Sequence, residues 1–182
     1  SWRRADVLQR ELFPDDAQRA ILIRDNLAAS LLGQGKKEQA ATMLRSMLTD
    51  PLLDEQRIGE SRIANLRMTL ARALRDLERY GEALPLARSA AATSEKIFGA
   101  DHYQTLVQLS TVASIYDASG DCLSALPIQR TVRNRMAARY GADKQATLVE
   151  TGNQGGMEFD CGDRNTGLAL LRQAESTLRA KF

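Results

Sequence analysis

Few residues of this chain could perform chemistry. Its single histidine, His102, could act as a general base only in contact with the group whose proton it removes. No Ser, Cys or carboxylate can be placed in such a contact from the sequence, and His102 stands where a helical pattern begins. We therefore interpret His102 as a residue that caps or packs at a helix start. We predict that the chain is not an enzyme.

The two cysteines, Cys122 and Cys161, have a spacing that fits no metal site. A structural zinc site needs about four ligands, whereas the chain offers two cysteines and one histidine. We interpret both as small, buried apolar side chains. The alternative is a disulfide bond between them, which would require an oxidising compartment. We expect no metal and no cofactor.

A glycine-rich segment runs from Gly152 to Gly156. It is not a phosphate loop, because no strand precedes it and no Lys-Ser or Lys-Thr pair follows. Glu158 and Asp160 stand two residues apart, so they do not share a helical face. Each interior glycine costs a helix about 1 kcal/mol. The helix is therefore either loosely held or packed closely against a neighbour, and the sequence leaves both open.

The composition is that of a protein with a continuous core and a mixed surface. The 182 residues are 43% hydrophobic and 26% charged, with a formal net charge of +2. Acidic and basic residues are mixed along the whole length, which argues against nucleic-acid binding. No apolar run approaches the roughly 18 residues that insert into a membrane. Because the chain starts at Ser1, we expect a piece of a longer protein.

Small residues recur at a spacing of about 42 residues, which predicts a repeat architecture. Each repeat has a small residue, a turn position and a second small residue, and a series of aromatic residues accompanies them. The small-residue sets are Ala28/Gly35/Ala40, Ala71/Glu78/Ala83, Ala113/Gly120/Ala125 and Gly155/Gly162/Gly167, and the aromatic residues are Phe13, Phe98, Tyr140 and Phe182. We expect the paired small residues to let two helix backbones approach closely.

Apolar residues recur at helical spacing throughout, and no alternating strand pattern competes. We predict an all-α solenoid of about nine helices in one repeat domain, 1–182. An orphan helix at 1–12 precedes four repeats at 16–48, 57–97, 102–139 and 144–181. The helix pairs are 16–33 with 36–48, 57–77 with 80–97, 102–118 with 121–139, and 144–160 with 164–181. Asp16, Asp101 and Asp143 are expected to cap helices, and a longer loop is expected around Asp50-Pro51.

Four segments resemble the tetratricopeptide repeat, in the variety of about 42 residues seen in kinesin light chains and bacterial multidomain proteins. Its link between helix pairs is similar to Gly99-Ala100-Asp101-His102-Tyr103-Gln104-Thr105-Leu106 and to Gly141-Ala142-Asp143-Lys144-Gln145-Ala146-Thr147-Leu148. Its turn within a pair is similar to Tyr80-Gly81-Glu82-Ala83-Leu84 and to 120–126. The resemblance covers residues 13–182. Glu158 departs from it, because the other repeats have Leu31, Leu74 and Tyr116 at this position.

The resemblance implies a right-handed superhelix whose concave face is lined by the first helix of each pair. It also implies that a row of residues on this face binds the main chain of a peptide, since an Asn side chain offers both donors and an acceptor. That row is Asn26, Thr69, Thr111 and Asn153, and further inner-face residues are Arg72, Arg75 and Ser114. The alternative is that these are ordinary surface polar residues, with the arginines paired to Asp76 or Asp117.

The resemblance therefore implies a module that binds a protein or peptide. A second possibility is a regulatory, sensor or dimerisation domain of a larger bacterial protein, such as a serine/threonine kinase or a winged-helix transcriptional regulator. A third is an accessory lobe of an enzyme. Apolar residues near the chain ends could support self-association, and these are Trp2, Val7, Leu8, Leu178 and Phe182. We expect no nucleic acid and no membrane insertion through this domain.

Overall fold

The computed structural model describes residue 4 and residues 7–8, 16–53 and 55–181. The chain divides into two compact units, Ser1–Thr93 and Ser94–Phe182. Of the predicted helix at 1–12, only residues 4, 7 and 8 are described. Trp2, Phe13 and Phe182 also lie outside the described residues.

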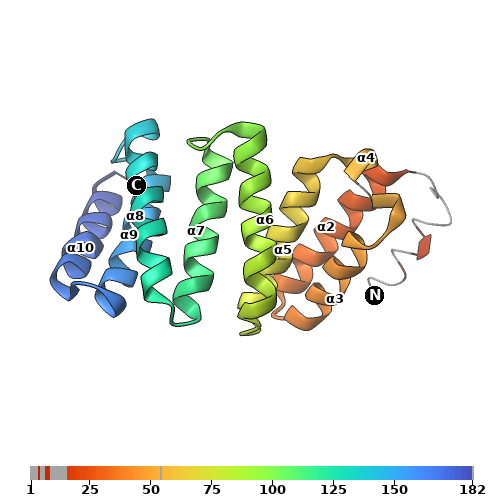
Figure 1. Ribbon diagram of the computed structural model, residues 1–182, viewed down its shortest axis with the longest axis horizontal. Helices are drawn as coiled ribbons and strands as arrows, with labels where there is room; N and C mark the ends of the chain where they lie inside the picture. Colours follow the sequence, from red (N-terminus) through yellow and green to blue (C-terminus); the bar gives the residue numbers. More distant parts are fainter. Residues whose placement is uncertain (1–3, 5–6, 9–15, 54, 182) are drawn as a thin grey trace. The chain divides into compact units, whose positions relative to one another are not determined.

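The first unit consists of helices joined by short links (Figure 1). Helix α2 (Ala17–Gly33) contacts α3 (Lys37–Leu48), and α3 contacts α5 (Glu60–Arg75). Helix α6 (Tyr80–Phe98) follows α5 after a tight turn at 76–79, and its residues 94–98 belong to the second unit. Between α3 and α5, the predicted longer loop contains a 3₁₀ turn, η1 (Pro51–Leu53), and a short helix, α4 (Glu55–Ile58).

The second unit contains two helix hairpins. Helix α7 (Tyr103–Ala118) contacts α8 (Cys122–Tyr140), and α9 (Gln145–Cys161) contacts α10 (Arg164–Lys181). Helices α8 and α9 also contact each other, which joins the hairpins. No strand occurs among the residues that the structure describes. The predicted all-α class is therefore confirmed, and the hairpin helices begin and end within three residues of their predicted bounds.

The small residues that recur in the repeat are buried, as predicted. Ala28, Ala71 and Ala113 are at most 1% exposed, and Ala40, Ala83 and Ala125 are fully buried. In the last hairpin, a Cβ on Gly167 would lie 2.7 Å from the carbonyl oxygen of Gly155. The backbones of α9 and α10 therefore meet with no room for a side chain. This settles the question that the glycine-rich helix left open, because α9 packs closely at Gly155.

Helix capping follows the prediction only in part. Asp16 caps α2, since its Oδ1 accepts a hydrogen bond from the Arg19 amide at 2.9 Å. The expectation that Asp101 and Asp143 cap helices was wrong, because His102 and Lys144 occupy the N-cap positions of α7 and α9 in extended backbone. The carboxylates of Asp101 and Asp143 instead form ion pairs with Arg135 and Lys181.

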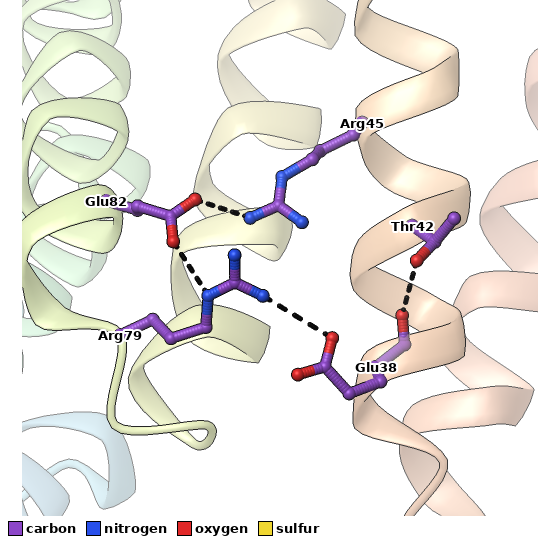
Figure 2. Close-up of polar contacts among 5 residues, drawn as sticks. All are labelled: Glu38, Thr42, Arg45, Arg79 and Glu82. Atoms are coloured by element: carbon purple, nitrogen blue, oxygen red, sulfur yellow. Dashed lines mark hydrogen bonds and ion pairs between the residues drawn. The ribbon is translucent and has the colours of Figure 1, made fainter.

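Two ionic groups join elements of the first unit. Arg24 is 4% exposed, and its Nη1 lies 2.6 Å from Asp50 Oδ2 in the link after α3. A surface network joins α3 to α6 (Figure 2). Its members are Arg45 and Glu82 (2.6 Å), Arg79 and Glu82 (2.7 Å), and Arg79 and Glu38 (3.5 Å).

Within the described ranges, no helix has the length and apolar character needed to span a bilayer.

Candidate functional site

The predicted binding row lies on the first helix of each pair. Asn26 is on α2 and Thr69 on α5, in the first unit. Thr111 is on α7 and Asn153 on α9, in the second unit. The predicted row therefore divides into two half-rows, one in each unit.

In the first unit, Asn26 is exposed on α2 and Thr69 is half-buried on α5. The Thr69 hydroxyl donates to the carbonyl oxygen of Asn65, one turn earlier, at 3.0 Å. Its hydrogen is therefore used within the helix, and only lone pairs remain for a ligand. Asn26 is consequently the residue of this half-row that offers both a donor and an acceptor.

The two predicted arginines of α5 differ in their surroundings. The Arg75 guanidinium donates through Nε (3.0 Å) and Nη2 (2.8 Å) to Asp76 Oδ1. The intramolecular pairing that was the alternative interpretation is thus confirmed for Arg75. Arg72 is exposed at the surface. Partial desolvation lowers the pKa of its guanidinium, and the positive charge of Arg75 lowers this pKa further.

In the second unit, the half-row is more buried than predicted. Thr111 is only 7% exposed, and its hydroxyl donates to the Val107 carbonyl oxygen at 3.1 Å. Ser114 is half-buried and Asn153 is exposed. The Asn153 Nδ2 donates a hydrogen bond to Glu150 Oε2 at 3.1 Å. Asn153 is therefore both accessible and held by a neighbour.

Glu150 is the centre of a buried polar cluster that the sequence analysis did not find. Its side chain is 6% exposed on α9. Its Oε2 accepts hydrogen bonds from Ser110 Oγ of α7 (2.6 Å) and Gln129 Nε2 of α8 (2.9 Å), in addition to Asn153. The Gln129 amide also donates to the Glu150 carbonyl oxygen at 3.1 Å. One carboxylate thus connects three helices.

This cluster decides which way the Asn153 amide points. Glu150 Oε2 also accepts hydrogen bonds from Ser110 and Gln129, so the nitrogen end of the Asn153 amide, which is the donor, faces it. The Asn153 Oδ1 and one N–H remain for another partner. These are the two groups that a peptide main chain can pair with through its own N–H and C=O.

A signal for the cluster was present in the sequence. Helix α9 has polar residues at the positions that its helical spacing turns toward the core. They are Thr147, Glu150, Thr151, Gln154 and Glu158, all of which are buried. Polar residues at core positions are hydrogen-bonded in native proteins, so the pattern indicates buried partners on neighbouring helices.

The departure at Glu158 has a similar explanation. Glu158 is 1% exposed, and both of its oxygens accept hydrogen bonds from Arg130 of α8, at 2.6 and 2.8 Å. Gln154 Nε2 lies 3.3 Å from the same carboxylate. The hydrogen bonds from Arg130 hold the pKa of Glu158 below its usual value against the effect of burial. The pair replaces an apolar contact between the hairpins with an ionic one.

Cys122 and Cys161 form a disulfide bond, with their Cα atoms 5.5 Å apart. Our interpretation of both as free, buried apolar residues was therefore wrong. The bond joins the first residue of α8 to the last residue of α9, and both side chains are half-buried. The two cysteines are 39 residues apart, so their pairing depends on how the hairpins pack.

Two carboxylates lie near this bond. Asp117 Oδ1 of α7 is 3.8 Å from the Cys161 sulfur. Burial raises the pKa of Asp117, and the negative charge of Asp160 raises it further. Asp160 is exposed at the end of α9.

His102 has the structural role that the sequence predicted. Its Nδ1 accepts a hydrogen bond from the Gln104 amide at 3.2 Å, and its ring stacks on Phe98 with the centroids 4.8 Å apart. Among the residues that the structure describes, no three His, Cys, Asp or Glu side chains gather where they could hold a metal ion.

Comparisons with known proteins agree with a fold built of helical repeats. Residues 62–138 match the sequence model of the tetratricopeptide repeat. A search of curated proteins found no match. Two similar solved structures are the nearly identical TPR-like repeats of a Podosopora anserina protein described as a kinesin light chain, and BtubC from P. vanneervenii. Each is 17% identical to this chain.

The structural similarity extends over nearly the whole chain. The Podosopora anserina structure has a TM-score of 0.81 and covers 97% of this chain and 82% of its own. The BtubC structure has a TM-score of 0.80 and covers 98% of this chain and 71% of its own. This fold is generally that of a non-catalytic scaffold for protein interactions. Residues 62–138 are therefore tetratricopeptide repeats, and the chain has the fold of the kinesin-light-chain-like members of that family.

Proposed function

We propose that this chain is a peptide-binding module in which the first helices of the pairs hold an extended polypeptide segment. The observation that carries the proposal is the Asn153 side chain, which is exposed and oriented by Glu150. Its free N–H and carbonyl oxygen form a matched pair of groups for a peptide main chain. Asn26 is the corresponding exposed amide of the first unit.

Such a module recognises the backbone more than the side chains of its ligand. Asn26 and Asn153 are neutral, and the charged residues on the first helices of the pairs, such as Arg72, Asp117 and Asp160, include both signs. The ligand therefore needs an extended conformation and no strong net charge. A preorganised binding group reduces the entropy lost on binding, and the hydrogen bond to the Glu150 cluster holds the Asn153 amide in one orientation.

The test begins with peptides selected from a random-sequence display library on the 182-residue chain. Their dissociation constants are then measured by fluorescence anisotropy for the wild type, Asn26→Ala, Asn153→Ala and the double variant. We expect each single change to weaken binding about 5- to 20-fold, which corresponds to one hydrogen-bonded pair of about 1–2 kcal/mol.

Asn134→Ala is the matched control, because Asn134 is an exposed amide on the second helix of its pair, α8. It should bind the selected peptides like the wild type. Equal affinities for the wild type and the Asn26→Ala/Asn153→Ala double variant would contradict the proposal.

A second candidate is favoured by the disulfide. A bond between Cys122 and Cys161 persists in oxidising compartments, which fits a sensor or dimerisation domain of a larger bacterial protein outside the cytoplasm. The test is alkylation of the parent protein with a maleimide-linked polymer in freshly lysed cells. Unmodified Cys122 and Cys161 support this candidate, whereas complete modification of both contradicts it.

A further inference from the structure

A cavity lies at one end of the α7–α8 hairpin in the second unit. It has a volume of about 360 Å³ and is formed by the link 98–102 before α7 and by the last two residues of α8, Arg139 and Tyr140. All of these residues belong to the second unit. None of them is in the predicted binding row.

The walls of the cavity are held in place by contacts from both sides. Phe98 stacks on His102, and the Tyr140 hydroxyl donates to the Asp101 carbonyl oxygen at 3.2 Å. Arg135 donates to the Ala100 carbonyl oxygen at 3.5 Å, and its Nε lies 3.6 Å from Asp101 Oδ1. The aromatic rings are therefore positioned before any ligand arrives.

The charges of the cavity do not balance. The Asp101 carboxylate is neutralised by Arg135. Arg139 is exposed and has no ion pair or hydrogen bond with any other residue described by the structure. The His102 Nδ1 accepts a hydrogen bond, so in the neutral ring the hydrogen is on Nε2, which is a donor. The cavity thus offers a guanidinium and an N–H donor beside the Phe98 and Tyr140 rings.

A guanidinium pairs best with a planar carboxylate through two parallel hydrogen bonds. Aromatic rings favour a large apolar or aromatic side chain. The volume of about 360 Å³ is near the lower limit of ligand pockets, about 300–1,000 Å³. A ligand of this size must carry the carboxylate and the apolar group on one residue. The last residue of a polypeptide has both.

We propose that this cavity binds the C-terminal residue of a partner polypeptide that ends in a large apolar or aromatic side chain. Arg139 pairs with the terminal carboxylate, and the side chain packs against Phe98 and Tyr140. The site does not depend on peptide binding by Asn26 and Asn153.

The test is an ¹H–¹⁵N NMR titration of the 182-residue chain with three probes. They are the peptide acetyl-Ser-Gly-Phe with a free carboxylate, the same peptide as a C-terminal amide, and free L-phenylalanine. We expect the acid to shift the amide signals of Gly99, Ala100 and His102, with a dissociation constant of the order of 1 mM. The amide should bind at least fivefold more weakly, since it lacks the charge.

Arg139→Gln should weaken binding of the acid at least fivefold. Arg88→Gln, at another exposed arginine on α6, is the matched control and should leave it unchanged. Equal binding of acid and amide, or no saturable shift at Gly99, Ala100 and His102, overturns the proposal. Tighter binding of free phenylalanine than of the peptide acid overturns the assignment to a chain terminus. The comparison between the peptide acid and the peptide amide uses only the wild-type chain. It therefore tests the proposal even if Arg139→Gln does not fold.

Discussion

The side-chain amide of Asn153 donates a hydrogen bond to Glu150 Oε2 over 3.1 Å, and Ser110 and Gln129 donate to the same oxygen. An exposed residue of the predicted binding row is thereby tied to a carboxylate that is 6% exposed. This relationship couples the predicted binding row to the packing of α7, α8 and α9.

Glu150→Leu should destabilise the fold by about 2–4 kcal/mol, because it leaves several buried donors without an acceptor. Glu150→Gln should cost about 1 kcal/mol, since its single carbonyl oxygen still accepts hydrogen bonds. Urea denaturation followed by circular dichroism measures both. The control is Glu175→Gln, at a glutamate on α10 that is 61% exposed and paired only on the surface with Arg179. Equal denaturation midpoints for Glu150→Leu and Glu175→Gln would show that the cluster does not stabilise the fold.

Gly167→Ala should destabilise the last hairpin by roughly 1–3 kcal/mol through overpacking. The added Cβ would lie 2.5 Å from the Phe159 amide nitrogen and 2.7 Å from the Gly155 carbonyl oxygen, both of which are backbone atoms of α9. The helices must therefore separate. Thermal denaturation measures the loss.

Gly152→Ala is the matched control for that change, because nothing lies within 4 Å of a Cβ added at Gly152. Because position 152 lies inside α9, the Gly152→Ala substitution should stabilise the chain by about 0.5–1 kcal/mol. Alanine has a higher helix propensity than glycine. If both substitutions changed the melting temperature in the same direction, the close approach of α9 and α10 would be in doubt.

Removal of the disulfide should destabilise the second unit by about 4 kcal/mol, because the bond restricts the unfolded chain over 39 residues. The measurement is the urea midpoint with and without a dithiol reductant. The Cys122→Ala/Cys161→Ala double variant should match the reduced wild type and should not respond to the reductant. A wild-type midpoint that the reductant leaves unchanged would be inconsistent with a stabilising bond.

The Arg130–Glu158 pair makes stability depend on pH. The pKa of Glu158 is lowered in the folded state by the hydrogen bonds from Arg130. The stabilisation that the Arg130–Glu158 pair gives the fold is therefore fully present above the ordinary pKa of a glutamate. It is lost as the pH falls through the lowered folded-state pKa of Glu158. Arg130→Met should destabilise the chain by roughly 1–3 kcal/mol at pH 7, since it leaves a buried carboxylate without its cation.

The same variant should differ less from the wild type as the pH falls through the lowered folded-state pKa of Glu158. Unfolding free energies at pH 7 and pH 3 measure the change. Arg88→Met removes an exposed arginine of α6 and should show no such pH dependence. A constant difference between Arg130→Met and the wild type at both pH values would exclude the ionic contribution.

The helices and their links could be predicted from the sequence because they depend on local interactions. Helical spacing of apolar residues predicted eight long helices that the described residues contain. Buried alanines at Ala28, Ala71 and Ala113 followed from their place in the repeat. The turn positions followed too, since Gly35 and Gly120 have φ values of +72° and +82°, which favour glycine. Each of these features is decided by residues close together in the chain.

The polar and covalent contacts between hairpins could not be predicted in this way. Ser110 and Glu150 are 40 residues apart, Arg130 and Glu158 are 28 apart, and Cys122 and Cys161 are 39 apart. Their pairing depends on the packing of α9 against α7 and α8, which only the tertiary structure decides. A carboxylate at a core position shows from the sequence that it needs a partner. The identity of that partner follows from the three-dimensional packing, because residues on several other helices could reach it.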